Sequence, residues 1–282
     1  MSLLRERMIE DMQLRGFSAS TQEMYVRSVS QLSSYVHRSP DKVTEEELRE
    51  YFLYLANEKK CSRSTATVAL CGIKFFYQNT LRRDWPTLHL MRPRPEYKLP
   101  VVLSREEVRR VLAEVRVPLY RVCLTTIYSC GLRLMEGARL GVADVDGARM
   151  VLNIHGKGKR DRQVALPEST LLLLRGFWKT HRSPKWLFPS RDLNHAGNPV
   201  TGESLQRAFR DAWKKTGIAK RAHVHSLRHS YATHLMEMGV HLRLIQDSLG
   251  HRSPKTTAVY THLTSQVRDT LTDPLRELMK DL

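Results

Sequence analysis

The chain has 282 residues, 41% of them hydrophobic, which is enough for one large domain or two ordinary ones with real cores. It has no apolar run near the ~18 residues of a membrane-spanning helix, and its first residues lack the apolar core of a secretory signal. The formal net charge of +17 indicates a polyanionic partner. Because the lysines and arginines are dispersed rather than gathered in one amphipathic segment, nucleic acid is favoured over a membrane surface.

Residues 2–80 predict four helices. A second helix is expected after the capping segment 17–21, a third after the capping box formed by Thr44 and Glu47, and a fourth after Ser62 or Ser64. The first helix is predicted from an apolar stripe at roughly helical spacing, made of Leu3, Leu4, Met8, Met12 and Leu14. Taken alone, this half fits a bundle that grips DNA and a helical interaction module equally well.

A linker is expected after this bundle. Residues 91–100 hold three prolines and four charged residues, a composition typical of a stiff, extended connection. We place a helical domain at 1–90, the linker at 91–101 and a second domain at 102–282. Residues 96–282 carry 31 basic and 18 acidic residues, against 15 and 11 in 1–95, so most of the positive excess lies beyond the linker.

The second half predicts a mixture of helices and a small sheet. A capping box at Ser104 and Glu107 begins a helix, and 118–140 is a helical stretch interrupted near Gly131. Residues 149–154 and 162–166 alternate as strands of a hairpin whose tip, 155–161, is basic and glycine-rich. Helices return from about 201. The expected fold is therefore mainly α with a small β-sheet.

The four cysteines form no Cys-x-x-Cys pair and lie in apolar helical patterns. We expect reduced, buried thiols without a catalytic or metal-binding role. They are Cys61, Cys71, Cys123 and Cys130.

A basic and aromatic constellation runs through the second half. It comprises Arg133, Lys157, His225, Arg228, His251 and Tyr260, with no carboxylate among its main members. Two guanidinium groups can grip the non-bridging oxygens of a phosphate, where charge accumulates during phosphoryl transfer. Histidines can donate to the same oxygens or move protons, and nearby cations stabilise a phenolate nucleophile. Such a site suits metal-free attack of a phenol oxygen on a phosphodiester.

Three alternatives stay open on the residues alone. His225 and His229, four residues apart and near His234, are also compatible with zinc, although no His-Glu-x-x-His pattern is present and Arg228 would lie beside the cation. Lys159 rivals Lys157 as the proton donor, since both follow a glycine. Tyr260 is one of ten tyrosines, and spacing alone does not single it out.

Together these segments resemble the tyrosine recombinase (phage integrase) family, in particular a simple Xer-like or transposon-borne recombinase. The likeness is carried by segments 131–136, 155–162, 225–235, 249–251 and 256–262, in the order Arg, Lys, His-x-x-Arg, His, Tyr. It implies a four-helix, SAM-like core-binding domain followed by an α+β catalytic domain. It also implies that Lys157, not Lys159, protonates the leaving oxygen and that Tyr260 is the nucleophile.

The resemblance further implies a function. Tyr260 would form a 3′-phosphotyrosyl link in double-stranded DNA, and two rounds of exchange between paired sites would pass through a Holliday junction. No cofactor, metal ion or ATP would be needed. A homotetramer on DNA would form by exchange of a C-terminal helix at 273–282 between protomers. The alternative is that this helix packs on its own domain. The expected location is the bacterial cytoplasm, at the nucleoid.

Two rivals remain at this point. A type IB topoisomerase shares the chemistry but relaxes DNA without exchanging partners, and a catalytically silent regulator would bind DNA only. The biological outcome, whether integration, excision, resolution or transposition, is not specified by the sequence. Cys130 and Gly137 depart from the family's usual pattern, and a mid-helix glycine costs about 1 kcal/mol relative to alanine.

Overall fold

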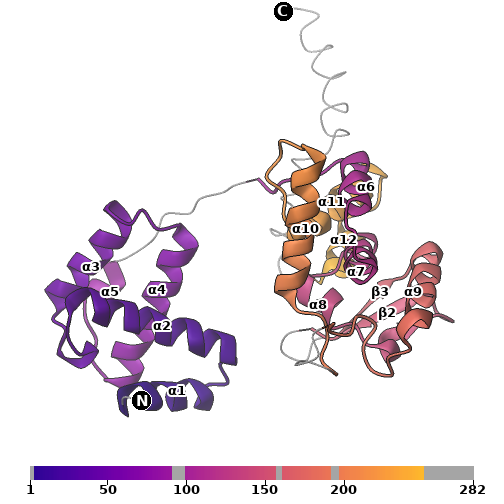
Figure 1. Cartoon of the computed structure of the whole chain (residues 1–282). Helices are drawn as coiled ribbons and strands as arrows, with labels where there is room; N and C mark the ends of the chain where they lie inside the picture. Colours follow the sequence, from indigo (N-terminus) through magenta and orange to yellow (C-terminus); the bar gives the residue numbers. More distant parts are fainter. Residues whose placement is uncertain (1–2, 91–98, 157–160, 192–196, 251–282) are drawn as a thin grey trace, which may run out of the picture. The chain divides into compact units, whose positions relative to one another are not determined.

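The computed structural model describes residues 3–90, 99–156, 161–191 and 197–250. The chain divides into two compact units, Met1–Lys98 and Leu99–Leu282, and Figure 1 labels the helices and strands of each. Most of the expected linker lies outside the described residues. The assignment of a DNA-gripping role to the first unit and a catalytic role to the second stays a prediction.

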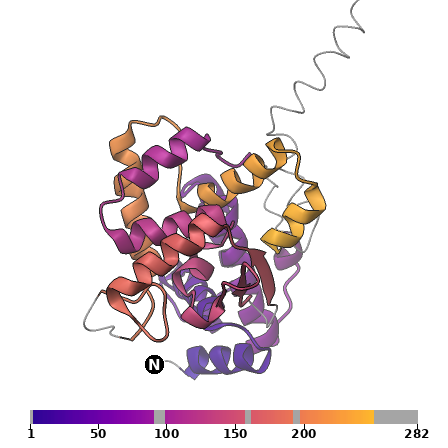
Figure 2. The ribbon, with the colours of Figure 1, turned by 90° about the vertical axis from the view of Figure 1, so that its right-hand side faces the viewer.

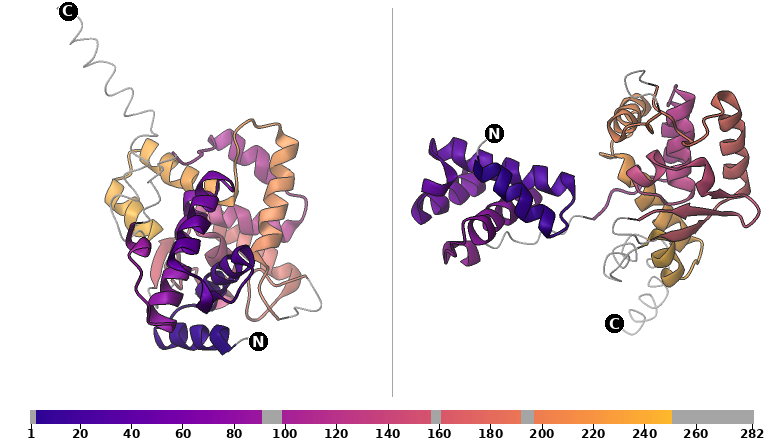
Figure 3. Two further views of the ribbon diagram at one scale, coloured as in Figure 1. Left: turned by 90° about the vertical axis from the view of Figure 1, so that its left-hand side faces the viewer. Right: turned by 90° about the horizontal axis from the view of Figure 1, so that it is seen from below.

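The first unit is built of helices, as Figure 3 shows from two further directions. Its main helices are α1 (Leu3–Leu14), α2 (Ala19–Val36), α3 (Glu45–Asn57) and α4 (Arg63–Phe75), followed by the short α5 (Thr87–Leu90). A 3-10 turn at Pro40–Lys42 joins α2 to α3, and a π-helical turn at Phe76–Thr80 extends α4. The four predicted helices are therefore confirmed.

The helix starts follow the predicted caps. In α3 the Glu47 N–H donates to Thr44 Oγ1 (3.2 Å) while the Thr44 N–H donates to Glu47 Oε2 (2.9 Å), which completes the capping box. The start of α4 settles the open alternative in favour of Ser62, whose Oγ accepts from the Thr65 N–H (3.3 Å).

The predicted apolar stripe of α1 is only partly right. Met8 and Met12 are fully buried, whereas Leu3 is 83% and Leu14 88% exposed. At 100° per residue, Leu14 lies on the face opposite Met12, and Leu3 is rotated well away from Met8. These two leucines therefore do not belong to the core.

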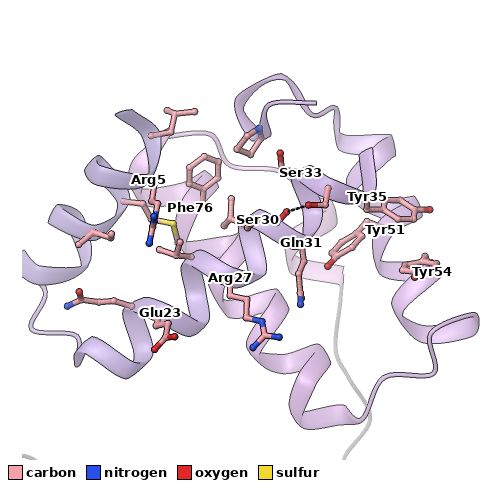
Figure 4. A pocket seen from close by; sticks show the side chains of 18 of the residues that line it. Arg5, Glu23, Arg27, Ser30, Gln31, Ser33, Tyr35, Tyr51, Tyr54 and Phe76 are labelled. Atoms are coloured by element: carbon pink, nitrogen blue, oxygen red, sulfur yellow. Dashed lines mark hydrogen bonds between the residues drawn. The ribbon is translucent and has the colours of Figure 1, made fainter. Parts of the chain in front are cut away.

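A cavity of about 1050 Å³ lies in the first unit among α1, α2 and α3 (Figure 4). Its aromatic side holds Tyr35, whose ring lies 5.2 Å from that of Tyr51 and 4.7 Å from that of Tyr54. Burial, with smaller contributions from Cys61 and Tyr54, raises the pKa of Tyr51 to about 12. A phenol held in this way is a poor nucleophile.

The second unit is a helical body around a small sheet. Its helices are α6 (Arg105–Ala113), α7 (Pro118–Ser129), α8 (Leu134–Ala138), α9 (Glu168–His181), α10 (Gly202–Thr216), α11 (Val224–Glu237) and α12 (Leu242–Leu249). The strands are β1 (Val145–Asp146), which follows a 3-10 turn at Val142–Asp144, β2 (Val151–Ile154) and β3 (Arg162–Ala165). The prediction of a mainly helical fold with a small sheet is confirmed.

The sheet is antiparallel, in the order β1-β2-β3. Val151 pairs with Ala165 and Ile154 with Arg162, so the two predicted strands form the expected hairpin. The sequence did not predict β1. Strand β3 contacts α12, and Figure 2 shows this helix beside the sheet. The hairpin therefore brings Arg162 next to the end of α12.

The interruption near Gly131 is also confirmed. Helix α7 ends at Ser129 and α8 begins at Leu134, and Gly131 has a φ of +60°, a region that glycine adopts without steric cost. Gly137 lies where α8 crosses α7: a Cβ there would come within 2.4 Å of Ile127 Cγ1. The unusual glycine therefore permits a close helix contact.

The cysteines agree with the prediction in part. All four are free, and Cys123 and Cys130 are buried in the core of the second unit. The expectation of burial is wrong for Cys71, which is exposed, and Cys61 is half-buried. Along the chain as the structure describes it, no helix is long and apolar enough to cross a membrane.

Candidate active site

Helix α11 places Arg228 in the interior of the second unit. Its start is fixed by His223, whose N–H donates to Ser226 Oγ (3.2 Å). One turn on, Arg228 is only 5% exposed. Its Nη1 donates to the Gly131 carbonyl oxygen (2.7 Å) and its Nη2 to that of Leu249 (2.6 Å). The guanidinium thus joins the break between α7 and α8 to the end of α12.

Arg133 lies directly before α8 and is more open, with its side chain 42% exposed. Its Nη1 donates to Glu136 Oε1 (2.7 Å) and its backbone N–H to Glu136 Oε2 (2.8 Å). Nη2 donates to the Gly250 carbonyl oxygen (3.2 Å). A guanidinium held at two of its nitrogens and open to solvent still has N–H groups to offer a ligand.

The centre of the cluster is the carboxylate of Glu136, which is 9% exposed. Arg162 grips both of its oxygens in a fork, with both distances 2.8 Å, and Arg228 Nη1 lies 3.9 Å from Oε2. Burial alone would raise the pKa of Glu136. The hydrogen bonds from Arg162 and from the Arg133 backbone outweigh it and lower the pKa to about 2. The carboxylate is therefore ionised at neutral pH.

Three consecutive carbonyl oxygens at the C-terminal end of α12 each accept a hydrogen bond from a different arginine. The pairs are Ser248 with Arg162 Nε (3.0 Å), Leu249 with Arg228 Nη2 (2.6 Å) and Gly250 with Arg133 Nη2 (3.2 Å). The last carbonyls of a helix have no partner within the helix and carry its partial negative charge, so cations are favoured there. These contacts fix the end of α12, directly before His251 in the sequence.

His225 lies in the first turn of α11 at the edge of this cluster, where part of the residue is open to solvent and part of the ring is covered by protein. Its partial burial and the charges of His223, Arg228 and Arg133 lower its pKa. The imidazole is accordingly neutral at pH 7, with one N–H donor and one acceptor. His225 also borders a cavity of about 500 Å³, whose cationic side is formed by Arg210 and Arg221.

Tyr231 is the tyrosine of α11 that lies against this cluster. Its hydroxyl is 3.3 Å from Ser248 Oγ, and a Cβ on Gly131 would come within 2.5 Å of its ring. Burial, outweighing the opposing effects of Ser248 and Arg228, raises its pKa. Tyr231 thus packs against the glycine break and is a poor candidate for the nucleophile.

Of the six predicted site residues, the structure brings together Arg133, His225 and Arg228. Lys157, His251 and Tyr260 lie outside the described residues, as does Lys159, and their catalytic roles stay predictions.

The six predicted residues include no carboxylate, but the structure places the Glu136 carboxylate among Arg133, Arg162 and Arg228. Neither Glu136 nor Arg162 was among the predicted site residues. The i,i+3 spacing of Arg133 and Glu136 gives a weak signal for their pairing. The contact between Glu136 and Arg162 joins residues 26 positions apart, and no local pattern reveals it.

The described histidines do not point to zinc. One ring nitrogen of His234 is already engaged, since Tyr128 Oη lies 2.9 Å from His234 Nδ1. Within the described ranges, no three histidine, cysteine, aspartate or glutamate side chains are grouped so as to hold a metal ion.

Comparison with known proteins places the chain in a family. Residues 102–266 match the phage integrase family, and residues 4–87 match the phage integrase N-terminal SAM-like domain. A Sinorhizobium fredii protein named as an integrase/recombinase, y4qK, is 41% identical over 93% of this chain and 85% of its own length. Tyrosine recombinase XerC of Halalkalibacterium halodurans is 33% identical over 80% of this chain and 79% of its own.

The fold agrees with that match. A lambda integrase dimer bound to a COC′ core site aligns with a TM-score of 0.74, covering 91% of this chain and 93% of that one, at 15% identity. The chain therefore belongs to the phage integrase family. As a member, it is a tyrosine-type site-specific recombinase.

Proposed function

We propose that this recombinase cuts and rejoins double-stranded DNA through a covalent link between Tyr260 and a 3′-phosphate. The observation that carries the proposal is the convergence of Arg133 and Arg228 on one buried carboxylate, with His225 near enough for its pKa to be affected by their charges. The arrangement occurs in a chain that belongs to the phage integrase family.

The charge balance of the cluster supports phosphate binding. Three guanidinium groups surround the single carboxylate of Glu136, so the cluster keeps a positive excess. A phosphodiester carries one negative charge, and more accumulates on its non-bridging oxygens during transfer. Arg133 has N–H groups open to solvent, and neutral His225 has one more donor. Fixed donors around such oxygens stabilise the transition state.

The proposed reaction conserves the phosphodiester. Tyr260 gives its phenolic proton to water as its oxygen attacks phosphorus, a tyrosyl–phosphate bond forms at the 3′ side, and the bond to the 5′ oxygen breaks. Lys157 supplies the proton that makes the leaving group a 5′-hydroxyl, while His251 assists at the phosphate. A 5′-hydroxyl from the partner duplex then attacks the phosphotyrosyl bond and releases the tyrosine, so no ATP is consumed.

The exchange takes place between paired sites in two rounds, through a Holliday junction. Four protomers cooperate, linked through the segment 273–282. The cavity beside His225 supports contacts to flanking phosphates, because Arg210 and Arg221 line it. Such contacts position DNA without reading its sequence. Integration, excision, resolution and transposition are all served by this chemistry.

Formation of a covalent adduct tests the proposal. The substrate is a library of randomised duplexes with a nick near each potential cleavage site. After cleavage, the short 5′-hydroxyl fragment diffuses away, so the covalent adduct cannot be rejoined. The adducts are then separated on a denaturing gel. The wild-type chain and Tyr231→Phe are expected to form adducts, also in excess EDTA, and Tyr260→Phe is expected to form none. Adducts that persist in Tyr260→Phe would refute the assignment of the nucleophile, and their loss in EDTA would refute metal-free chemistry.

A further inference from the structure

Arg162 of β3 is held more firmly than a surface arginine. Its side chain is 13% exposed, and it makes three hydrogen bonds, two to Glu136 and one to the Ser248 carbonyl. A Cβ on Gly250 would come within 2.9 Å of Arg162 Cδ, so the aliphatic stem lies directly against this glycine. Forked contacts of this kind fix both the position and the plane of the carboxylate.

The same carboxylate is the partner of Arg133. Glu136 Oε1 accepts from Nη1 of both arginines, at 2.7 Å from Arg133 and 2.8 Å from Arg162. Because Arg162 occupies the forked face of the carboxylate, the guanidinium of Arg133 reaches it through Nη1 alone. Its Nη2 instead donates to the Gly250 carbonyl. Without Arg162, the fork of Glu136 would be open to the Arg133 guanidinium, and one more of its N–H donors, beyond Nη1, would turn from the phosphate to the carboxylate.

We infer that Arg162 is a positioning residue of the cleavage reaction, which orients Arg133 through Glu136 and holds the end of α12 through the Ser248 carbonyl. The inference rests on the proposed function, since it assigns a task to Arg133 at the phosphate. Arg162 itself is turned toward protein groups and is not placed on the substrate. Its loss should therefore slow cleavage while leaving DNA affinity nearly unchanged.

The test uses the full chain and a duplex recovered from the wild-type adducts. Arg162→Lys keeps the charge and removes the fork. Its single-turnover cleavage rate is expected to fall by up to about a hundredfold, because a small misplacement of a positioned catalytic group can cost that much. Its dissociation constant for the duplex should stay within about threefold, because its positive charge is retained. Arg149→Lys, at an exposed arginine that touches Gln163, is the matched control and should cleave at the wild-type rate.

A double-mutant cycle separates positioning from a general structural role. If Arg162 acts through Glu136, then Arg162→Lys should slow cleavage little further in a Glu136→Gln background. A wild-type rate in folded Arg162→Lys, or a full additional loss in the double variant, would overturn the inference. Arg162→Gln is measured in parallel with Arg162→Lys. If neither of these two variants unfolds cooperatively, Arg162 is needed for folding, and the inference is wrong in that case too. A wild-type chain that forms no adduct would instead refute the proposed function.

Discussion

Arg228 donates through Nη1 to the carbonyl oxygen of Gly131, 97 residues earlier in the chain, over 2.7 Å. This bond holds α11 against the break between α7 and α8, two residues before Arg133. The two arginines of the candidate site therefore differ in kind. Arg228 is a buried structural tie, whereas Arg133 is the more open cation.

Replacing each arginine should separate stability from activity. Arg228→Ala leaves two carbonyls and part of the Glu136 charge without their partner, and should lower the free energy of unfolding by about 3–5 kcal/mol. Arg133→Ala, at a half-exposed position, should cost about 1 kcal/mol. Both should lose adduct formation. Urea unfolding followed by circular dichroism measures the difference, and equal losses would contradict it.

Gly131 should tolerate no side chain. Its φ of +60° is strained for alanine, and the added Cβ would meet the Tyr231 ring at 2.5 Å. Gly131→Ala should therefore cost roughly 3 kcal/mol or more, combining backbone strain and overpacking. Gly16 is the matched control, since its φ is +70° but no heavy atom lies within 4 Å of the added Cβ. Gly16→Ala should cost only about 1 kcal/mol, and equal losses in thermal unfolding would show that the Tyr231 contact is unimportant.

Lowering the pH should reduce the free energy of unfolding of the second unit, because Glu136 becomes protonated. The pKa of this carboxyl is about 2 in the folded chain, below its ordinary 4.5, so the folded state gains stability above 4.5. That gain, of about 3 kcal/mol, is lost as the pH falls from 4.5 through 2. The free energy of unfolding should therefore decrease less between neutral and acid pH for Glu136→Gln than for the wild type. Parallel curves would show that Glu136 is not held as an ion.

His155 should titrate above the ordinary histidine range. It lies at the end of β2, with Nδ1 3.0 Å from Asp161 Oδ2 and Nε2 3.2 Å from Asp144 Oδ1. The hydrogen bond to Asp161, followed by the charges of Asp144 and Asp161, raises its pKa. The stabilisation is complete below the ordinary pKa near 6.5 and is lost as the pH rises through the raised value.

An NMR titration of the His155 ring measures this shift directly. Asp161→Asn should remove more of it than Asp144→Asn, because the Asp161 hydrogen bond is its first cause. A His155 that titrates as a free histidine in the wild type would contradict the contacts on both sides of the ring.

Local signals explain what the sequence predicted well. Capping boxes at Thr44 and Ser104 begin helices where expected, and Gly131 interrupts a helix because its φ is positive. The His-x-x-Arg spacing puts His225 and Arg228 one turn apart on α11. Each of these features depends on residues within a few positions of one another.

The rest depends on contacts between distant segments. Whether a position such as Cys71 is buried is set by which distant residues pack on it, and the local sequence pattern does not specify those neighbours. The partnership of Glu136 with Arg162 arises only when β3 pairs with β2 and meets the end of α12. The sequence around a charged residue does not indicate which distant residue it will pair with in the folded domain.

The three arginines that grip the end of α12 come from the start of α8, from β3 and from α11, up to 117 residues away from their acceptors. A fragment shorter than the span from Arg133 to Gly250 lacks at least one of these groups. If the proposed function holds, a nascent polypeptide that has not yet reached Gly250 has no assembled phosphate-binding centre, and strand cleavage would have to wait until this part of the domain is complete.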